Sequence, residues 1–202
     1  MIVAIDFGIT NTDVAVSNKS QYKIFSIPSK NTNESFIDEI ISLIDIDITE
    51  ISQIVVTGGK SNELNESFKG VNLTKISETD AIGYGTKEIY KIENEPFLTL
   101  SCGTGTACIH HQDGQFSYIG GIAVGGGTIS GLSKAILDSS SLEEITDLAL
   151  KGNRKNIDLL IGDVVNEIGI LNSNVTASNF AKLKNTNTFS KEDISHAMLN
   201  IV

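Results

Sequence analysis

Short apolar runs and alternating polar and apolar residues dominate the first half of the chain. Successive side chains of a strand point to opposite faces, so the alternation at residues 12–17 and 22–27 predicts two strands. Further strands are predicted at the short, mostly apolar segments 2–7, 53–57 and 72–76. Apolar residues recur three and four positions apart over 34–44, which is the spacing of an amphipathic helix. A second helix is predicted from Glu78 to Tyr90, with Ser77 as its N-cap and Asp80 as the shorter acid of a capping box.

After the polar segment 93–96, which holds one of the two prolines, the pattern starts again. It predicts strands and then helices, the strands at 97–101, 106–111 and 116–119 and the helices at 128–137, 142–151, 179–184 and 190–202. The polar stretch 172–179 is predicted to be a loop with a helix cap. Two similar halves favour a pseudo-duplicated α/β protein with domains at 1–94 and 95–202.

The last predicted helix has a clear beginning and an unusual end. Ser190 is a suitable N-cap and two acids follow it in the first turn, but the segment closes on apolar residues from Met198 to Val202. No later sequence is left to cover this apolar face. The pattern therefore predicts either a truncated second domain or burial of the helix against a partner chain.

Three loops rich in glycine and threonine interrupt the pattern, at 6–12, 100–107 and 120–128. Glycine lets the main chain approach a ligand closely, so that backbone N–H groups and hydroxyls of such turns reach phosphate oxygens. The first two loops follow apolar strands, and the third opens a predicted helix. Three such loops in one short chain indicate a nucleotide phosphate site.

Composition narrows the possible partners. A chain of 202 residues with 40% hydrophobic residues is long enough for a sizeable core. The formal net charge of −10 argues against a nucleic-acid partner, which cationic side chains would have to bind. With Arg154 as the single arginine, a phosphate must be held by backbone amides, hydroxyls, a lysine or a divalent cation. No apolar run approaches the roughly 20 residues of a membrane span, so a cytoplasmic protein without membrane contact is predicted.

The remaining residues with reactive side chains predict no further chemistry. Cys102 and Cys108 are predicted to be buried free thiols, and the three histidines follow no metal-ligand spacing. His110 and His111 are expected to close a strand. Arg154 is expected to tie helices together or to serve a subunit contact.

A set of motifs spans nearly the entire chain in the order found in a known family. They are Asp6-Phe7-Gly8-Ile9-Thr10, Thr57-Gly58-Gly59, Glu78-Thr79-Asp80-Ala81, Gly103-Thr104-Gly105-Thr106, Gly125-Gly126-Gly127-Thr128, the run from Gly152 to Leu159, and Thr176-Ala177-Ser178-Asn179-Phe180. In this order the chain resembles the type II pantothenate kinases, which belong to the superfamily of actin-like ATPases with the acetate and sugar kinases.

The resemblance implies an α/β fold with the two-lobed, ribonuclease H-like architecture of actin-like ATPases, its second lobe incomplete. It also implies binding of ATP and Mg²⁺, phosphorylation of pantothenate as the first step of coenzyme A synthesis, and a homodimer. Glu78 matches the catalytic glutamate, and Asp6 matches the residue that holds Mg²⁺ through water. The residues implied to contact phosphate are Gly8, Thr10, Asn11, Thr12, Gly103, Thr104, Gly105, Thr106, Gly125, Gly126, Gly127 and Thr128.

The chain departs from the family pattern at several points. Asp13 stands where the family commonly has a lysine, Ala107 where bacterial members have a serine, and Tyr118 where an arginine grips the carboxylate of the acceptor. Ala107 and Tyr118 are therefore the candidate acceptor contacts. The family's C-terminal part, with its adenosine-binding strand and turn, is absent, so weak nucleotide binding is expected of this chain.

Two other functions stay open. One is an ATP-binding relative that has lost its chemistry or acts on a different hydroxylated acceptor. The other is an ATP-dependent hydrolase of the hydantoinase/oxoprolinase type, because the loop from Gly8 to Asp13 is similar to the N-terminal loop of that group.

Overall fold

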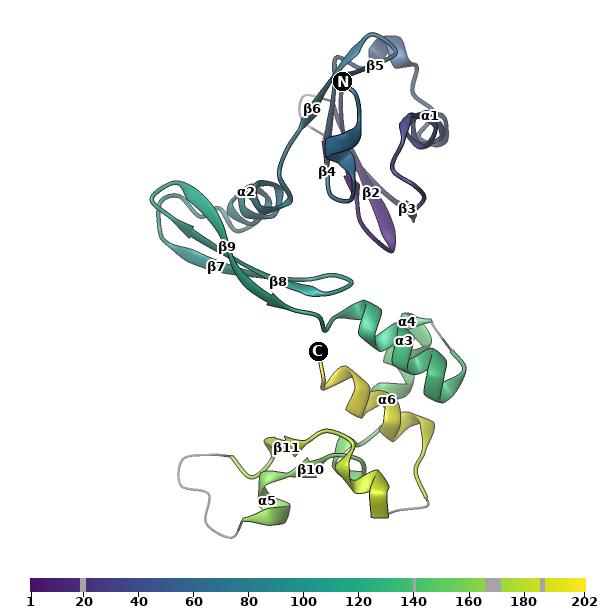
Figure 1. Cartoon of the computed structure of the whole chain (residues 1–202), viewed down its shortest axis with the longest axis vertical. Coiled ribbons are helices and arrows are strands. Elements are labelled where there is room, and N and C mark those ends of the chain that lie inside the picture. Colours follow the sequence, from purple (N-terminus) through teal and green to yellow (C-terminus); the bar gives the residue numbers. More distant parts are fainter. Residues whose placement is uncertain (19–20, 140, 166–171, 186–187) are drawn as a thin grey trace. The chain divides into compact units, whose positions relative to one another are not determined.

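The computed structural model describes residues 1–18, 21–139, 141–165, 172–185 and 188–202 (Figure 1). Its contacts divide the chain into two compact units. The first consists of Met1–Ser101 with Ala107–Gly120, and the second of Cys102–Thr106 with Gly121–Val202. Each unit contains a hydrophobic core of its own. The functional domain boundary between residues 94 and 95 stays a prediction.

A six-stranded sheet forms the body of the first unit, in the order β3-β2-β1-β4-β6-β5. Its strands are β1 (Ile2–Phe7), β2 (Asn11–Asn18), β3 (Gln21–Pro28), β4 (Gln53–Thr57), β5 (Ser67–Phe68) and β6 (Val71–Lys75). The first three strands are an antiparallel meander, whereas β4 lies parallel to β1 and β6 parallel to β4. The carboxyl ends of β1, β4 and β6 therefore share one edge of the sheet.

Helix α1 (Glu34–Leu43) covers one face of this sheet (Figure 1). Asn33 caps its N-terminus by accepting from the Phe36 amide. The apolar stripe of α1 packs on alternate residues of the strands, and its members Ile37 and Ile40 are fully buried beside Val3 and Ile54. On the opposite face the same strands carry Asp6 and Asp13, beside Ala4 and Ala15.

Helix α2 (Glu78–Tyr90) joins this sheet to a second sheet of the same unit, which has the order β7-β8-β9. Its strands are β7 (Phe97–Cys102), β8 (Thr106–Gln112) and β9 (Gln115–Ile122). Gly83 allows α2 to lie against Phe116 of β9, since a Cβ atom at this position would lie 2.2 Å from the Phe116 ring. Phe116 also meets Tyr84 and the buried His111, with ring centroids 4.8 and 4.9 Å away. His110 and His111 lie at the end of β8, as predicted.

The second unit is mainly helical. It contains α3 (Gly126–Leu137), α4 (Leu142–Ala149), the 3-10 helix η3 (Arg154–Asn156), α5 (Ile161–Val164), a strand pair of β10 (Leu159–Leu160) and β11 (Thr176–Ser178), the 3-10 helix η4 (Ala181–Asn185) and α6 (Lys191–Leu199). The fully buried Asp158 links several of these segments, because its carboxylate accepts from the Phe180 amide at 3.0 Å and from Asn200 at 3.3 Å.

Helix α6 corrects the expectation of an uncovered apolar face. Ile194, Ala197 and Met198 on this helix are fully buried within the second unit, in a cluster with Ile157. The helix ends at Leu199, before the last three residues. The covering residues are Leu132 and Leu137 of α3, Ile157 directly after η3, and Phe180 and Leu183 in and next to η4. Nothing about this helix therefore requires a partner chain.

Other local predictions also need correction. The segment predicted as a helix at 179–184 forms the 3-10 helix η4, and the predicted loop at 172–179 contains strand β11. Cys102 is exposed and Cys108 is half-buried, so the prediction of two buried thiols was wrong. Arg154 ties η3 to the β11 segment instead of joining helices, because its guanidinium donates to the Thr176 hydroxyl and the Asn174 carbonyl. In the described part of the chain, no helix combines the length and apolarity needed to cross a membrane.

Candidate functional site

Three polar side chains stand in a row across the first sheet. Asp6 near the end of β1 is paired with Asp13 on β2 and with Thr57 on β4. Residues paired across neighbouring strands point to the same face of a sheet. All three line one hollow of about 290 Å³ on the face opposite α1. The register of the strands thus brings two carboxylates and a hydroxyl together.

Two glycines after Thr57 bring the main chain close to Asp6. Gly58 has φ of +72° and Gly59 of +47°, a region that side chains rarely adopt. A Cβ atom on Gly58 would lie 2.4 Å from Oδ1 of Asp6, and one on Gly59 would lie 2.9 Å from the Phe7 carbonyl. The lack of a side chain at Gly58 therefore leaves the space that the carboxylate of Asp6 occupies.

The predicted phosphate loop between β1 and β2 is held from β3. Ser29 donates its hydroxyl to the Gly8 carbonyl at 2.6 Å, and its amide donates to the Thr10 carbonyl at 3.0 Å. Thr12 is fully buried and shares a 3.0 Å hydrogen bond with the Ser29 hydroxyl. Thr12 is therefore a buried residue that holds the loop through Ser29, whereas Gly8, Thr10 and Asn11 are exposed.

Glu78 belongs to the same electrostatic environment. It is the first residue of α2, whose N-cap Ser77 accepts from the Asp80 amide as predicted. Partial burial raises the pKa of Asp6, and the negative charges of Glu78 and Asp13 raise it further. None of the three carboxylates takes part in the ion pairs found among the described residues. The site thus has an excess of negative charge.

This group of oxygens fits a hydrated Mg²⁺ ion. Magnesium is commonly bound through one or two carboxylates and keeps several of its waters. The Thr57 hydroxyl is buried and has no hydrogen-bond partner, and because it is closed off from solvent it is not a ligand of such an ion. No group of three or more histidine, cysteine, aspartate or glutamate side chains is placed to enclose a metal in the described residues. The arrangement suits an open site with few protein ligands.

The two other glycine loops meet each other inside the second unit. The amides of Gly126 and Gly127 at the N-terminus of α3 donate to the carbonyls of Gly103 and Thr104, at 2.8 and 3.0 Å. The Thr106 hydroxyl donates to the Val124 carbonyl at 2.8 Å. A Cβ atom on Gly125 would lie 2.7 Å from the Thr104 carbonyl oxygen, so this contact excludes a side chain there. Gly105 and Thr128 complete the pair of loops, because Gly103 donates its amide to the Gly105 carbonyl and the Thr128 side chain caps α3 at Gly125.

The amides of Gly126 and Gly127 thus already have carbonyl partners. A phosphate at the α3 N-terminus would compete with the loop 103–106 for these donors. The structure thus brings two of the three predicted glycine loops together, with their amides bonded to each other's carbonyls and not available to a phosphate.

The candidate acceptor residues lie on the second sheet of the first unit. Ala107 is half-buried on β8, and Tyr118 on β9 is 61% exposed. Neither lines the hollow at Asp6. Their role in binding an acceptor stays a prediction.

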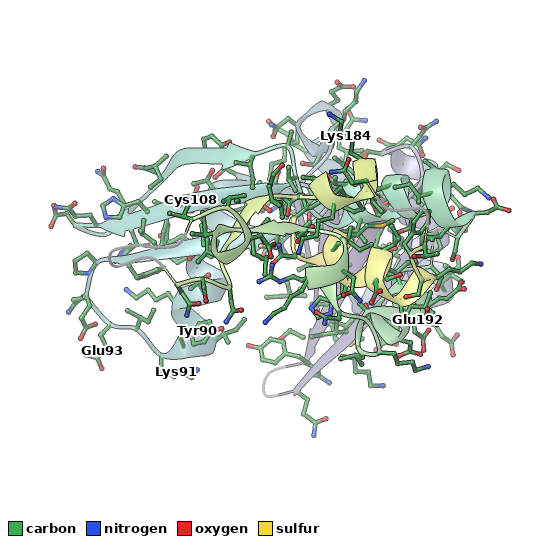
Figure 2. The ribbon with its side chains drawn as sticks, turned by 90° about the horizontal axis from the view of Figure 1, so that it is seen from below. Tyr90, Lys91, Glu93, Cys108, Lys184 and Glu192 are labelled. Carbon is green, nitrogen blue, oxygen red and sulfur yellow. The ribbon has the colours of Figure 1, made fainter. Side chains whose placement is uncertain are left out.

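A second hollow, of about 570 Å³, lies at the C-terminal end of α2. Figure 2 shows Tyr90, Lys91 and Glu93 together at this end of the helix. Lys91 forms an ion pair with Glu88, and both side chains are largely exposed. None of the predicted site residues lines this hollow, so the Asp6 hollow is the candidate functional site.

Sequence reasoning missed two residues of this site. Thr57 was recognised only as part of a motif, because its place beside Asp6 depends on the pairing of β1 with β4. Ser29 was not singled out, although a serine just after a strand is a common turn residue. The signal that could have found Thr57 is its position at the end of a buried strand, directly before two glycines.

Comparison with known proteins identifies relatives over nearly all of the chain. The family model described as Fumble matches residues 83–202. A type II pantothenate kinase of Bacillus anthracis is 32% identical over 99% of this chain and 73% of its own length. One from Bacillus cereus is 34% identical over 89% of this chain and 66% of its own length. The chain therefore spans about two thirds to three quarters of the length of these relatives.

A solved structure supports the fold. The activator of 2-hydroxyisocaproyl-CoA dehydratase from Clostridium difficile, with bound ADPNP, matches 98% of this chain and 70% of its own, with a TM-score of 0.60 and 15% identity. This likeness confirms a mixed α/β, actin-like ATPase fold. With the family model over more than half of the chain and relatives above 30% identity, the chain belongs to the Fumble family of type II pantothenate kinases.

Proposed function

We propose that this chain transfers the γ-phosphoryl group of ATP to the hydroxyl of pantothenate, giving 4′-phosphopantothenate and ADP. Family membership supports a kinase, and the observation that carries the proposal is the group of carboxylates around Asp6, next to the loop 8–12. Phosphoryl transfer depends on positioning and on neutralising the charge of the phosphates. A site with carboxylates for a cation beside a glycine loop suits that chemistry.

Glu78 is the proposed general base. The acceptor oxygen attacks the γ-phosphorus, the bond to the ADP oxygen breaks, and the proton of the hydroxyl passes to the Glu78 carboxylate. The charge of Glu78 raises the pKa of Asp6, and this nearness of the proposed base to the acid that the family resemblance assigns to Mg²⁺ supports the role. Asp6, whose carboxylate lies close to Gly58, is the residue proposed to hold the hydrated ion.

Mg²⁺, when bound, would neutralise charge on the β- and γ-phosphates. The loop from Gly8 to Asn11 supplies backbone groups toward the same phosphates, and Ser29 keeps this loop in shape. In the second unit, the amides of Gly126 and Gly127 could bind a phosphate only when their bonds to Gly103 and Thr104 are exchanged for phosphate oxygens. Nucleotide binding is therefore proposed to open the contact between these two loops. The ADPNP bound to the structurally similar activator is consistent with a nucleotide in this fold.

The test is ADP formation from ATP and Mg²⁺, with and without pantothenate. We expect pantothenate to stimulate ADP formation and Glu78→Gln to lower kcat by 100-fold or more, which is on the order of the contribution of a general base. Glu143→Gln is the matched control, because Glu143 is an exposed acid in the first turn of α4, as Glu78 is in the first turn of α2. This control variant should keep the activity of the unchanged chain.

Other outcomes separate the alternatives. ADP formation that pantothenate does not stimulate would contradict the proposal and favour an ATP-dependent hydrolase. Stimulation by a different hydroxylated compound alone would retain the kinase and replace the acceptor. Full activity of Glu78→Gln would contradict the assignment of the base.

A further inference from the structure

Strand β7 is an edge strand that lacks the usual protection against pairing with another chain. Natural sheets shield their edges with charged side chains, with proline or with very short strands. In the first sheet, the edge strand β3 carries Lys23 and ends at Pro28, and the edge strand β5 has only two residues. Strand β7 has six residues and contains neither a charged residue nor a proline.

The main chain of β7 is open on one side. Among the described strands, only β8 pairs with β7, and the turns and loops that the structure describes form no main-chain hydrogen bond with it. A row of its N–H and C=O groups can therefore accept a further strand. The opposite edge of the same sheet, β9, is less suited to this, because Gly120 and Gly121 interrupt it and glycine weakens a strand.

One face of β7 is also apolar and exposed. Thr99 donates its hydroxyl to that of Thr86 on α2, so its side chain points to the face that α2 covers. Leu98 and Leu100 flank Thr99 and point the other way, where they are 61% and 69% exposed. The open edge thus combines unpaired main-chain groups with two exposed leucines.

The distribution of charge indicates which partner fits this edge. The chain has a formal net charge of −10, so two copies repel each other over most of their surfaces. Between Glu95 and Lys134, however, the only charged side chain is that of Asp113, although 20% of all residues are charged. The second sheet is therefore a surface on which another copy of this acidic chain can approach without bringing carboxylates together.

An antiparallel pairing of β7 with its own copy is self-complementary. When Thr99 lies opposite the same residue of the second copy, Leu98 of each copy lies opposite Leu100 of the other, on the same face of the sheet. Glu95 then reaches the position of residue 103 of the other copy, which leaves the two Glu95 residues roughly 27 Å apart at about 3.4 Å per residue. This separation exceeds the screening length of about 8 Å at physiological salt.

We propose that two copies of this chain associate through β7, antiparallel about a two-fold axis, and join their three-stranded sheets into one continuous sheet. Main-chain hydrogen bonds and the opposed leucines hold the copies together. The contact is at the small end of specific interfaces, so a dissociation constant on the order of micromolar is expected. The inference goes beyond phosphoryl transfer and does not depend on it.

The test is sedimentation equilibrium of the full chain over a range of protein concentrations. We expect a reversible dimer with twice the chain mass of 21.6 kDa. Leu98→Lys places a charge on the open strand and should weaken the dimer at least tenfold. Leu43→Lys is the matched control, because Leu43 is 59% exposed at the end of α1, and it should leave the dimer unchanged. Circular dichroism shows whether both variants fold.

Two further readouts distinguish this interface from others. Added NaCl should strengthen the dimer, because it screens the repulsion between two acidic chains, whereas an interface held by ion pairs would weaken. In hydrogen exchange, the amides of Phe97–Cys102 should exchange more slowly at concentrations where the dimer forms, and those of Gln115–Ile122 should not change. A monomer at every concentration, a dimer that Leu98→Lys leaves intact, or a dimer without protection of β7 would overturn the proposal.

Discussion

Asp6 is the central residue of the candidate site, and its environment disfavours the ionised carboxylate in the folded state. Partial burial, then the charges of Glu78 and Asp13, raise the pKa of Asp6 above its usual value of 3.8. A carboxyl with a raised pKa in the folded state binds its proton more tightly there than in the unfolded chain. Its contribution to stability is full below pH 3.8 and is lost as the pH rises through the folded-state pKa.

Asp6→Asn should therefore raise the unfolding temperature at neutral pH in the absence of metal. The difference from the unchanged chain should shrink as the pH falls toward 3.8, and thermal unfolding followed by circular dichroism between pH 4 and 8 measures it. A lower unfolding temperature of Asp6→Asn at neutral pH would contradict this view of the site.

Asp193 is the matched case with the opposite sign. Burial alone would raise the pKa of Asp193, but hydrogen bonds from Asn156, the Asn153 amide and Ser190 outweigh burial and lower it. Its contribution to stability is present above the unfolded pKa and is lost as the pH falls through the folded-state pKa. Asp193→Asn should thus lower the unfolding temperature at neutral pH, in contrast to Asp6→Asn.

At the scale of elements, most regular strands and long helices could be predicted from the sequence to within two residues, whereas β9 and α6 differ from the prediction by three residues at their C-terminal ends. The apolar run at 2–7 and the helical spacing at 34–44 correspond to β1 and α1, because each buries one face against the other. The short strands β5, β10 and β11 could not be predicted, since two or three residues are too few to display a period. Motif order predicted Asp6 and Glu78, whereas the role of Thr57 depends on strand register, which a sequence alone does not display.

Gly125 offers a test of the contact between the two glycine loops of the second unit. Gly125→Ala places a Cβ atom 2.7 Å from the Thr104 carbonyl oxygen and 2.8 Å from that of Gly103, so the loops must separate. We expect a loss of about 1–3 kcal/mol in the free energy of unfolding, the usual cost of overpacking. Urea denaturation measures this loss.

Gly131→Ala is the control within the same helix. A Cβ atom at Gly131 meets no other atom within 4 Å, and alanine is favoured over glycine inside a helix. This variant should be equal to the unchanged chain or more stable, by up to about 1 kcal/mol. If both variants had the same stability, the proposed close contact between the loops would be wrong.

At the scale of the whole molecule, the structure changes how the C-terminal helix is understood. The sequence pattern of the last helix predicts either a truncated domain or burial against a partner chain, because no later sequence is left to cover its apolar face. In the structure, α6 packs on Ile157 and on residues of α3 and η4 within its own unit. The expected homodimer thus loses this argument and stays a proposal, drawn from family resemblance and from the open edge of β7.

The most direct test of the central claim is to identify the product. The chain is incubated with ATP, Mg²⁺ and pantothenate, and the mixture is followed by phosphorus nuclear magnetic resonance. The account predicts a new phosphate monoester signal that grows in equal amount with ADP and requires pantothenate. Formation of ADP with inorganic phosphate alone, or no loss of ATP in a correctly folded chain, would contradict it.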